Sequence, residues 1–145
     1  GFKANLSDIN ASLLKDQILG YKKIANIKKK IYFKLKKKLS YLKQIEFPNN
    51  LRNKYRDYYL FPIGVDKKIR NKLIEHLTSK KIFVTVNFKS ITSLSFYKKK
   101  YKVENCLNSN EWGDKTLSLP FHAKLKEKEI NEICKEISIF FLKKD

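Results

Sequence analysis

The first third of the chain repeats hydrophobic residues at intervals of three and four, which is the period of an amphipathic helix. The apolar positions form one stripe that contains Ile24, Ile27, Ile31, Leu35, Leu39 and Leu42. Ser7 or Asp8 offers a side-chain oxygen to the first free N–H groups of this helix. Gly20 predicts a kink or a break, and Pro48 with the two asparagines after it ends the pattern. We therefore expect a long helical segment over residues 1–46.

Apolar and polar positions alternate in two later segments, which is typical of strands. Residues 58–63 predict one strand, and Pro62 places it at a sheet edge or a strand end. Residues 82–88 give the clearest alternation, with Ile82, Val84, Val86 and Phe88 on one side. Residues 117–120 predict a third, brief strand. These segments indicate a small, mainly antiparallel sheet.

Helical patterns separate and follow these strands. Asp66 is placed to cap a helix that carries Ile69, Leu73, Ile74 and Leu77. Residues 96–101 predict a short helical turn. The last helix has an apolar face of 3.6-residue period, made of Ile130, Ile133, Cys134, Ile137 and Phe141. The whole chain, 1–145, is expected to be a single domain of the α/β (α+β) class, with the long helix followed by a small α/β unit over 47–145.

The composition agrees with one folded domain. The chain has 145 residues, of which 42% are hydrophobic and 13% aromatic, which excludes a disordered tail. No run of 18 apolar residues occurs, so we expect no membrane insertion. No signal-peptide pattern opens the sequence, and the two cysteines lack the spacing of a zinc site or a disulfide framework. A reducing, cytoplasmic location is the simplest expectation.

The formal net charge of +19 is unusual for a chain of this size. Such a balance is typical of proteins that bind nucleic acid or an anionic membrane surface. However, the 33 basic residues include only three arginines, whereas base and phosphate recognition favours the arginine fork. Both interpretations stay open: a Lys22–Lys43 face that binds RNA, DNA or anionic lipid, or solvated lysine side chains. We regard a nucleic-acid partner as the less favoured of the two.

The sequence offers few groups for catalysis. Its four glycines are far apart, so it has no glycine-rich phosphate loop. His76 and His122 are too distant in sequence to indicate a metal site. Cys134 belongs to an apolar helix face, and Cys106 has no basic neighbour to activate it. We predict no catalytic residue and no metal ligand.

Two places combine polar side chains with the end of a predicted element. Lys3 and Asn5 come just before the first helix, where a cation and an amide next to free N–H groups suit a phosphate or another anion. Asn87, Phe88 and Lys89 stand at the end of the clearest strand, where α/β sheets often contact ligands. A plain turn would explain the second place equally well.

The opening residues GFKANLSDINA resemble the stretch after the cofactor lysine in the DegT/StrS family of sugar aminotransferases, and Gln17 falls in the matching place. Three further stretches are similar to family motifs in the same order. They are residues 59–65 with Arg70, residues 84–88 followed by Phe96 and Tyr97, and the closing segment WGDKTLSLPFH at 112–122. Together the four stretches span nearly the whole chain.

This resemblance implies an enzyme that uses pyridoxal 5'-phosphate to transfer an amino group, usually from glutamate, to the keto-sugar of a nucleotide-linked sugar. It implies the small domain of a fold-type I aminotransferase and a homodimer with its site at the interface. Asn5 and Lys3 would then lie near the cofactor phosphate of the partner subunit. Asn87 and Phe88 would lie near the substrate, with Lys89 beside them.

The sequence also departs from the family pattern. Ser90-Ile91-Thr92 replaces a common Pro-Leu-His, which puts the substrate pocket in doubt, and Lys126 replaces an acidic or hydroxyl cap. The cofactor lysine and the rest of the large domain have no counterpart here. The sequence contains no Met and starts at Gly1. We therefore expect the C-terminal part of such an enzyme, inactive alone.

Two alternatives remain. One is the basic binding module described above, which should lose affinity steeply as salt rises. The other is a divergent homologue that has lost its catalytic half and kept a structural role. The leading hypothesis is the aminotransferase portion.

Overall fold

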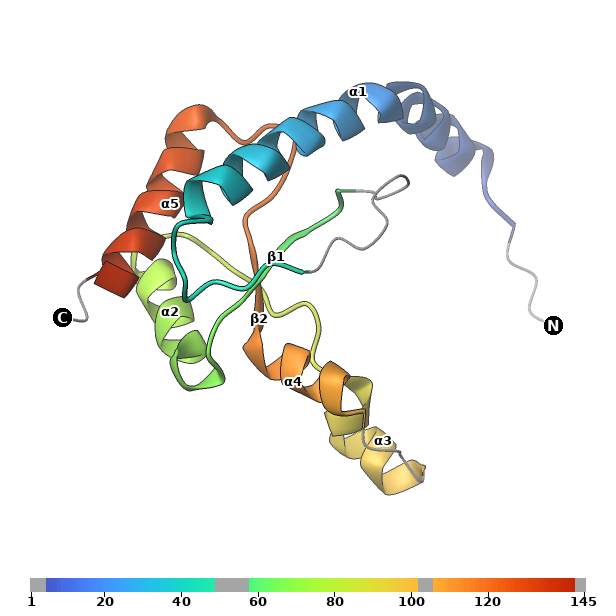
Figure 1. Cartoon of the computed structure of the whole chain (residues 1–145). Helices are drawn as coiled ribbons and strands as arrows, with labels where there is room; N and C mark the ends of the chain where they lie inside the picture. Colours follow the sequence, from blue (N-terminus) through green and yellow to red (C-terminus); the bar gives the residue numbers. More distant parts are fainter. Residues whose placement is uncertain (1–4, 49–57, 102–105, 143–145) are drawn as a thin grey trace.

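The computed structural model describes residues 5–48, 58–101 and 106–142. Helix α1 runs from Asp8 to Leu39, and Ser7 caps it by accepting a hydrogen bond of 3.3 Å from the backbone N–H of Asn10. The helix is continuous through Gly20, so of the kink or break predicted there, the break does not occur. Figure 1 shows the N-terminal part of α1 (blue) bending away from the line of its C-terminal part (teal).

The two halves of α1 differ in what they contact. In the C-terminal half, Ile31, Tyr32, Leu35 and Leu39 are buried. In and just before the N-terminal half, the large apolar side chains are exposed: Leu6, Ile9, Leu13, Leu14, Ile18, Leu19, Tyr21 and Ile24. The domain therefore covers the apolar stripe from Ile27 to Leu42, and it leaves Ile24 and the large apolar side chains before it exposed.

A two-stranded antiparallel sheet joins the middle of the chain to its end. Strand β1 spans Phe61–Gly64 and strand β2 spans Thr116–Leu119, with Phe61 opposite Leu119 and Gly64 opposite Thr116. On the outer side of β1, Gly64 and Glu46 exchange two hydrogen bonds of 2.8 Å. Pro62 faces the same side and has no N–H, so it cannot extend this ladder. The expected placement of β1 near a sheet edge is confirmed.

The prediction of a full strand over 82–88 is wrong. Thr85 alone pairs with β2, through hydrogen bonds of 3.2 and 2.7 Å with Ser118. The next pair toward the start of the segment would need an N–H from Pro120, which has none. Toward its end the segment turns away from the sheet, so the apolar alternation reflects burial of Ile82 and Val84 against the core rather than a ladder.

Helix α2 spans Lys67–Ser79, and helix α5 spans Glu127–Leu142. Asp66 caps α2 as expected, since its carboxylate accepts a 2.7 Å hydrogen bond from the N–H of Lys68. The two helices pack on each other, and α1 packs on α5 (Figure 1). Their buried side chains form one core with the sheet: Leu35, Leu39, Phe61, Ile63, Leu73, Leu77, Leu117, Leu119, Ile130, Ile133 and Ile137.

Three short helices project from the other end of the sheet (Figure 1). They are η2 at Ile91–Ser93, α3 at Ser95–Lys100 and α4 at Leu107–Lys115. The short turn at 96–101 is confirmed. The hydrophobic pattern predicts no element at α4, because its sequence, LNSNEWGDK, has no apolar stripe and contains residues of low helix propensity. Trp112 packs instead over Gly64, where a Cβ would come within 2.9 Å of the indole ring.

The fold is thus an α/β unit with a small antiparallel sheet, as the sequence predicts. No helix of the described residues has the length and apolarity needed to cross a bilayer.

Burial of Cys134 in α5 generates a testable prediction. Burial raises the pKa of its thiol from 9.0 to about 11, and the nearby charge of Lys38 opposes the shift. The folded state therefore favours the neutral thiol: this contribution to stability is complete below pH 9 and is lost as the pH rises from 9 through about 11. We expect a disulfide reagent at pH 8 to modify only the exposed Cys106 in the native chain and both thiols in urea. Reaction of both thiols without denaturant would show that α5 is not packed as described.

Candidate functional site

The segment Asn87-Phe88-Lys89 leaves the sheet just after its single bridge at Thr85. The hydroxyl of Thr85 donates a 2.6 Å hydrogen bond to the side-chain carbonyl of Asn87, which fixes the direction of that amide. The peptide between Asn87 and Phe88 is cis. The ring of Phe88 is 72% exposed, and Lys89 is also exposed. The structure therefore presents the predicted residues on an open surface.

Helix α4 supports this segment by direct backbone contact. A Cβ at Gly113 would come within 2.8 Å of the backbone nitrogen of Ser90 and 3.4 Å of the carbonyl oxygen of Phe88. Arg70 of α2 donates a 3.3 Å hydrogen bond to the carbonyl of Gly113. Only glycine lets α4 approach this closely, and Arg70 ties the contact to the core.

Hydroxyl groups fix the residues that follow. Ser109 donates to Ser90 at 3.1 Å, the Ser90 and Thr92 hydroxyls share a hydrogen bond of 2.8 Å, and Thr92 donates to the amide oxygen of Asn110 at 2.8 Å. Ser90 is 5% exposed, so these bonds satisfy a buried polar group. The Ser90-Ile91-Thr92 segment, which departs from the family motif, is thus bonded to α4. The side chains of Ser90 and Thr92 hold the preceding Asn87–Lys89 segment in place.

An exposed aromatic surface lies on α3, which packs on η2, the short helix that follows this segment. The rings of Tyr97 and Tyr101 stack with centroids 6.0 Å apart, and the Lys100 ammonium lies 5.4 Å from the Phe96 ring and 5.6 Å from the Tyr101 ring. These rings are exposed, because α3 buries none of its residues.

The two predicted cofactor residues lie at the opposite end of the chain. Lys3 is outside the described residues. Asn5 is exposed and comes three residues before the start of α1. Figure 1 shows that the N-terminal end of α1 projects away from the sheet, so this end and the Asn87–Lys89 segment do not form one site within a single chain.

Several lysines of α1 have partners inside the domain. The ammonium of Lys28 lies over the rings of Tyr59 and Phe121, at 5.5 and 5.3 Å. Lys34 pairs with Glu127, and Lys36 lies 5.7 Å from the ring of Phe47. Part of the basic face that could bind a polyanion is therefore used in packing.

The titratable groups with shifted pKa values on α4 form a surface ion pair. A hydrogen bond of 2.6 Å from Lys115 lowers the pKa of Glu111 and raises that of Lys115, which also lies 3.4 Å from Glu46. Exposed pairs of this kind contribute little to stability. Across the described residues there is no group of three or more His, Cys, Asp or Glu side chains that could hold a metal ion.

The fold is that of the sugar aminotransferases. The chain is similar to the aminotransferase TlmJ from Streptoalloteichus hindustanus, with a TM-score of 0.88 at 17% identity over 98% of this chain and 38% of that one. It is similar to Helicobacter pylori PseC, an aminotransferase involved in the biosynthesis of pseudoaminic acid, with a TM-score of 0.88 at 18% identity over 99% of this chain and 39% of that one. The sugar aminotransferase CalS13 from Micromonospora echinospora gives a TM-score of 0.79 at 14% identity, over 94% and 36%.

The sequence model of the DegT/DnrJ/EryC1/StrS aminotransferase family matches residues 1–138. The chain belongs to this family, as the resemblance of its motifs indicated. It spans less than two fifths of the length of the solved structures it matches. No curated protein matches it.

Aminotransferases of this family depend on pyridoxal 5'-phosphate, and a site for this cofactor must hold its phosphate. A phosphate suits amide donors and the free N–H groups at a helix N-terminus. Asn5 is an exposed amide beside the N-terminus of α1, which fits one contact to a phosphate held by another molecule. The described residues therefore offer one contact to a phosphate and do not form a complete phosphate site.

The close contact at Gly113 can be tested with a matched pair of glycine substitutions. Gly113→Ala places a methyl group against the Ser90 backbone and should lower the free energy of unfolding by about 1–3 kcal/mol. Gly20→Ala is the control, since its Cβ would meet only the Ile24 side chain at 3.9 Å. It should instead raise stability by about 0.5–1 kcal/mol through helix propensity. Urea unfolding measures both, and equal effects would show that α4 does not rest on this segment.

Proposed function

We propose that this chain is the C-terminal, small-domain portion of a pyridoxal-phosphate-dependent aminotransferase that acts on nucleotide-linked keto-sugars. The observation that carries the proposal is the family match over residues 1–138. The sugar aminotransferases among similar folds support a sugar as acceptor. The larger role would be the supply of amino sugars for cell-surface polysaccharides or glycans, with glutamate as amino donor.

The exposed apolar half of α1 supports a homodimer. Eight large apolar side chains in and just before this half are uncovered, which is more than a monomeric surface usually presents in one place. A second subunit that packs on this face would bury them. The same contact would carry Asn5, with Lys3 beside it, to the cofactor phosphate of the partner subunit, where the amide donates a hydrogen bond and the ammonium adds charge.

The Asn87–Lys89 segment supplies the substrate side of the proposal. The Asn87 amide, oriented by Thr85, is suited to bond a sugar hydroxyl. The exposed Phe88 ring offers an apolar face to a sugar or base, and the Lys89 ammonium suits a diphosphate. The anchoring of this segment on α4 supports a site held rigidly rather than a degraded one.

The chemistry of amino transfer would belong to the cofactor, which acts as an electron sink. This chain contributes no catalytic group in the proposal: its residues bind and orient. Its two cysteines are free, with Cys106 exposed, which suits a reducing, cytoplasmic compartment.

The alternatives are less well supported. A basic binding module would use the α1 lysines, and Lys28, Lys34 and Lys36 already have partners in the domain. A homologue without a catalytic half would have no need to anchor the Asn87–Lys89 segment by four polar side chains. Measurements of cofactor binding and substrate binding distinguish the aminotransferase portion from these two alternatives.

The cofactor role is tested on the product of the reading frame extended upstream of Gly1. The purified protein should show a visible absorption band with pyridoxal 5'-phosphate. Asn5→Ala removes a hydrogen bond to a charged group and should weaken cofactor binding about tenfold. Asn10→Ala, in the first turn of the same helix, is the matched control and should leave binding unchanged. Absence of the band in the extended protein would refute the proposal.

The substrate role is tested with two phenylalanines of equal exposure. Phe88 and Phe83 are 72% and 71% exposed, and only Phe88 lies in the proposed site. In the same extended protein, Phe88→Ala should raise the KM for the nucleotide-linked keto-sugar about tenfold, by loss of an apolar contact worth about 1–2 kcal/mol, and leave the cofactor band intact. Phe83→Ala should leave the KM unchanged. Equal effects of the two variants would exclude Phe88 from the substrate site.

A further inference from the structure

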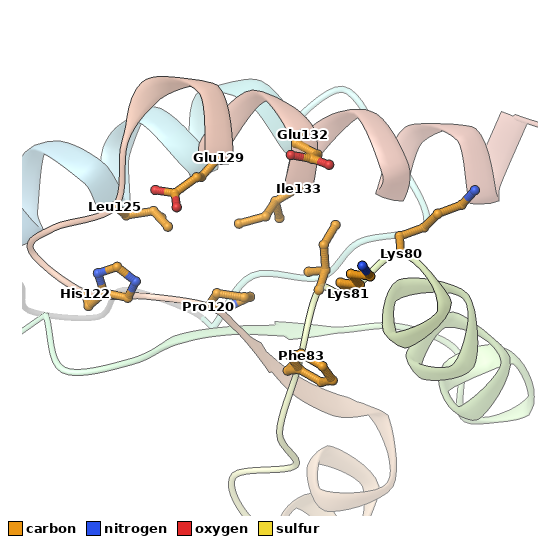
Figure 2. A pocket seen from close by; sticks show the side chains of 10 residues that line it. Lys80, Lys81, Phe83, Pro120, His122, Leu125, Glu129, Glu132 and Ile133 are labelled. Atoms are coloured by element: carbon orange, nitrogen blue, oxygen red, sulfur yellow. The ribbon is translucent and has the colours of Figure 1, made fainter.

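A cavity lies at the other end of the sheet, away from the Asn87–Lys89 segment. Its volume is about 420 Å³, within the range of small-molecule sites. It is bounded by the C-terminal end of α2, residues 120–125 and the first half of α5 (Figure 2). The proposed function uses none of its lining residues.

The floor of this cavity is apolar. Ile82 and Ile133 are buried in the domain core and expose their edges here, and Pro120 and Leu125 complete the floor. Figure 2 shows the Phe83 ring at the lower edge of the opening. A ligand with an apolar body would bury surface against these side chains.

The rim of the cavity carries both signs of charge on separate walls. Lys80 and Lys81 stand at the end of α2, and Glu129 and Glu132 stand on α5 above the floor (Figure 2). The carboxylate of Glu129 accepts a 2.6 Å hydrogen bond from the N–H of Lys126, which holds it in place. Among the described residues, the two rim lysines form no ion pair with the two rim glutamates. The rim therefore has one positively charged wall and one negatively charged wall, which suits a ligand that carries both a negative and a positive group.

Lys81 adds an independent observation. It has a φ of 61°, and its N–H bonds Thr78 while the N–H of Ile82 bonds Leu77, which is the Schellman ending of a helix. Glycine is the usual residue at this left-handed position because a Cβ is strained there. Here a lysine takes the position at the mouth of the cavity. A strained residue at the edge of a cavity is typical of a site where the side chain is needed.

We propose that this cavity binds a small zwitterion with an apolar body, of the class of an apolar amino acid or dipeptide. The apolar side chain would lie on Ile82 and Ile133. The ligand carboxylate would face Lys80 and Lys81, and its ammonium group would face Glu129 and Glu132. This proposal does not depend on the proposed function.

The test is a titration of the whole 145-residue chain, followed by ¹H–¹⁵N correlation spectra. The probes are the dipeptide Leu-Phe, L-phenylalanine, and Leu-Phe with either its amino group acetylated or its carboxyl group amidated. Leu-Phe or phenylalanine should shift the amides of Ile82 and Ile133 and leave those of Asn87–Lys89 in place. Each blocked dipeptide should bind about threefold more weakly, as expected for loss of one exposed ion pair.

Substitutions at Lys81 separate binding from folding. Lys81→Gly relieves the left-handed strain, so it should raise the thermal midpoint of the chain and yet weaken Leu-Phe binding about threefold. Lys81→Asn tolerates the same backbone conformation without the charge and should weaken binding equally. Lys43→Asn, on the surface outside the cavity, is the control and should bind as the parent chain does.

The proposal fails if the spectra show no shift at Ile82 and Ile133 with either unblocked probe. It also fails if the blocked dipeptides bind as well as Leu-Phe, which would indicate an apolar groove without charge recognition. Unchanged affinity in Lys81→Gly would remove the lysine from the site.

Discussion

The pairing of β1 with β2 is the contact on which the rest of this domain depends. The eight residues of the two strands come from segments more than fifty residues apart in sequence. The core helices pack on four of their side chains, those of Phe61, Ile63, Leu117 and Leu119. Helix α4 ends at Lys115 and β2 begins at Thr116, with no loop between them. The ladder therefore fixes α4, and α4 in turn fixes the Asn87–Lys89 segment through Gly113. Core packing and site geometry thus share one short sheet.

The elements that sequence reasoning found are those whose signals are local. The apolar periods of α1 and α5, the cap at Asp66 and the brief β2 all appear where the pattern puts them. The errors arise where tertiary contacts decide the outcome. Helix α4 forms because Trp112 covers Gly64, and residues 82–88 lose their ladder because Pro120 follows β2. No window of local sequence contains either partner.

The candidate site shows the same division. The sequence located Asn87, Phe88 and Lys89 at the end of a β-like segment, and the structure exposes them there. It could not reveal that Ser90 and Thr92 bond to Ser109 and Asn110, because these residues are separated by the whole of α3. Ser90-Ile91-Thr92, which departs from the family motif in sequence, forms hydrogen bonds with α4 in the folded chain. Lys3 lies outside the described residues, so its role rests on the sequence alone, that is, on its place just before the first helix and on the family resemblance.

The uneven burial of α1 has a thermodynamic consequence. The exposed stretch of α1 extends a helix that is already nucleated by its packed C-terminal half, and each added residue gains little from propagation alone, so this stretch is only marginally stable in water. In the homodimer proposed above, helix content and association would be linked equilibria: packing of a second subunit on the apolar side chains from Leu6 to Ile24 would supply free energy that keeps these turns helical, and dilution to monomers would remove it.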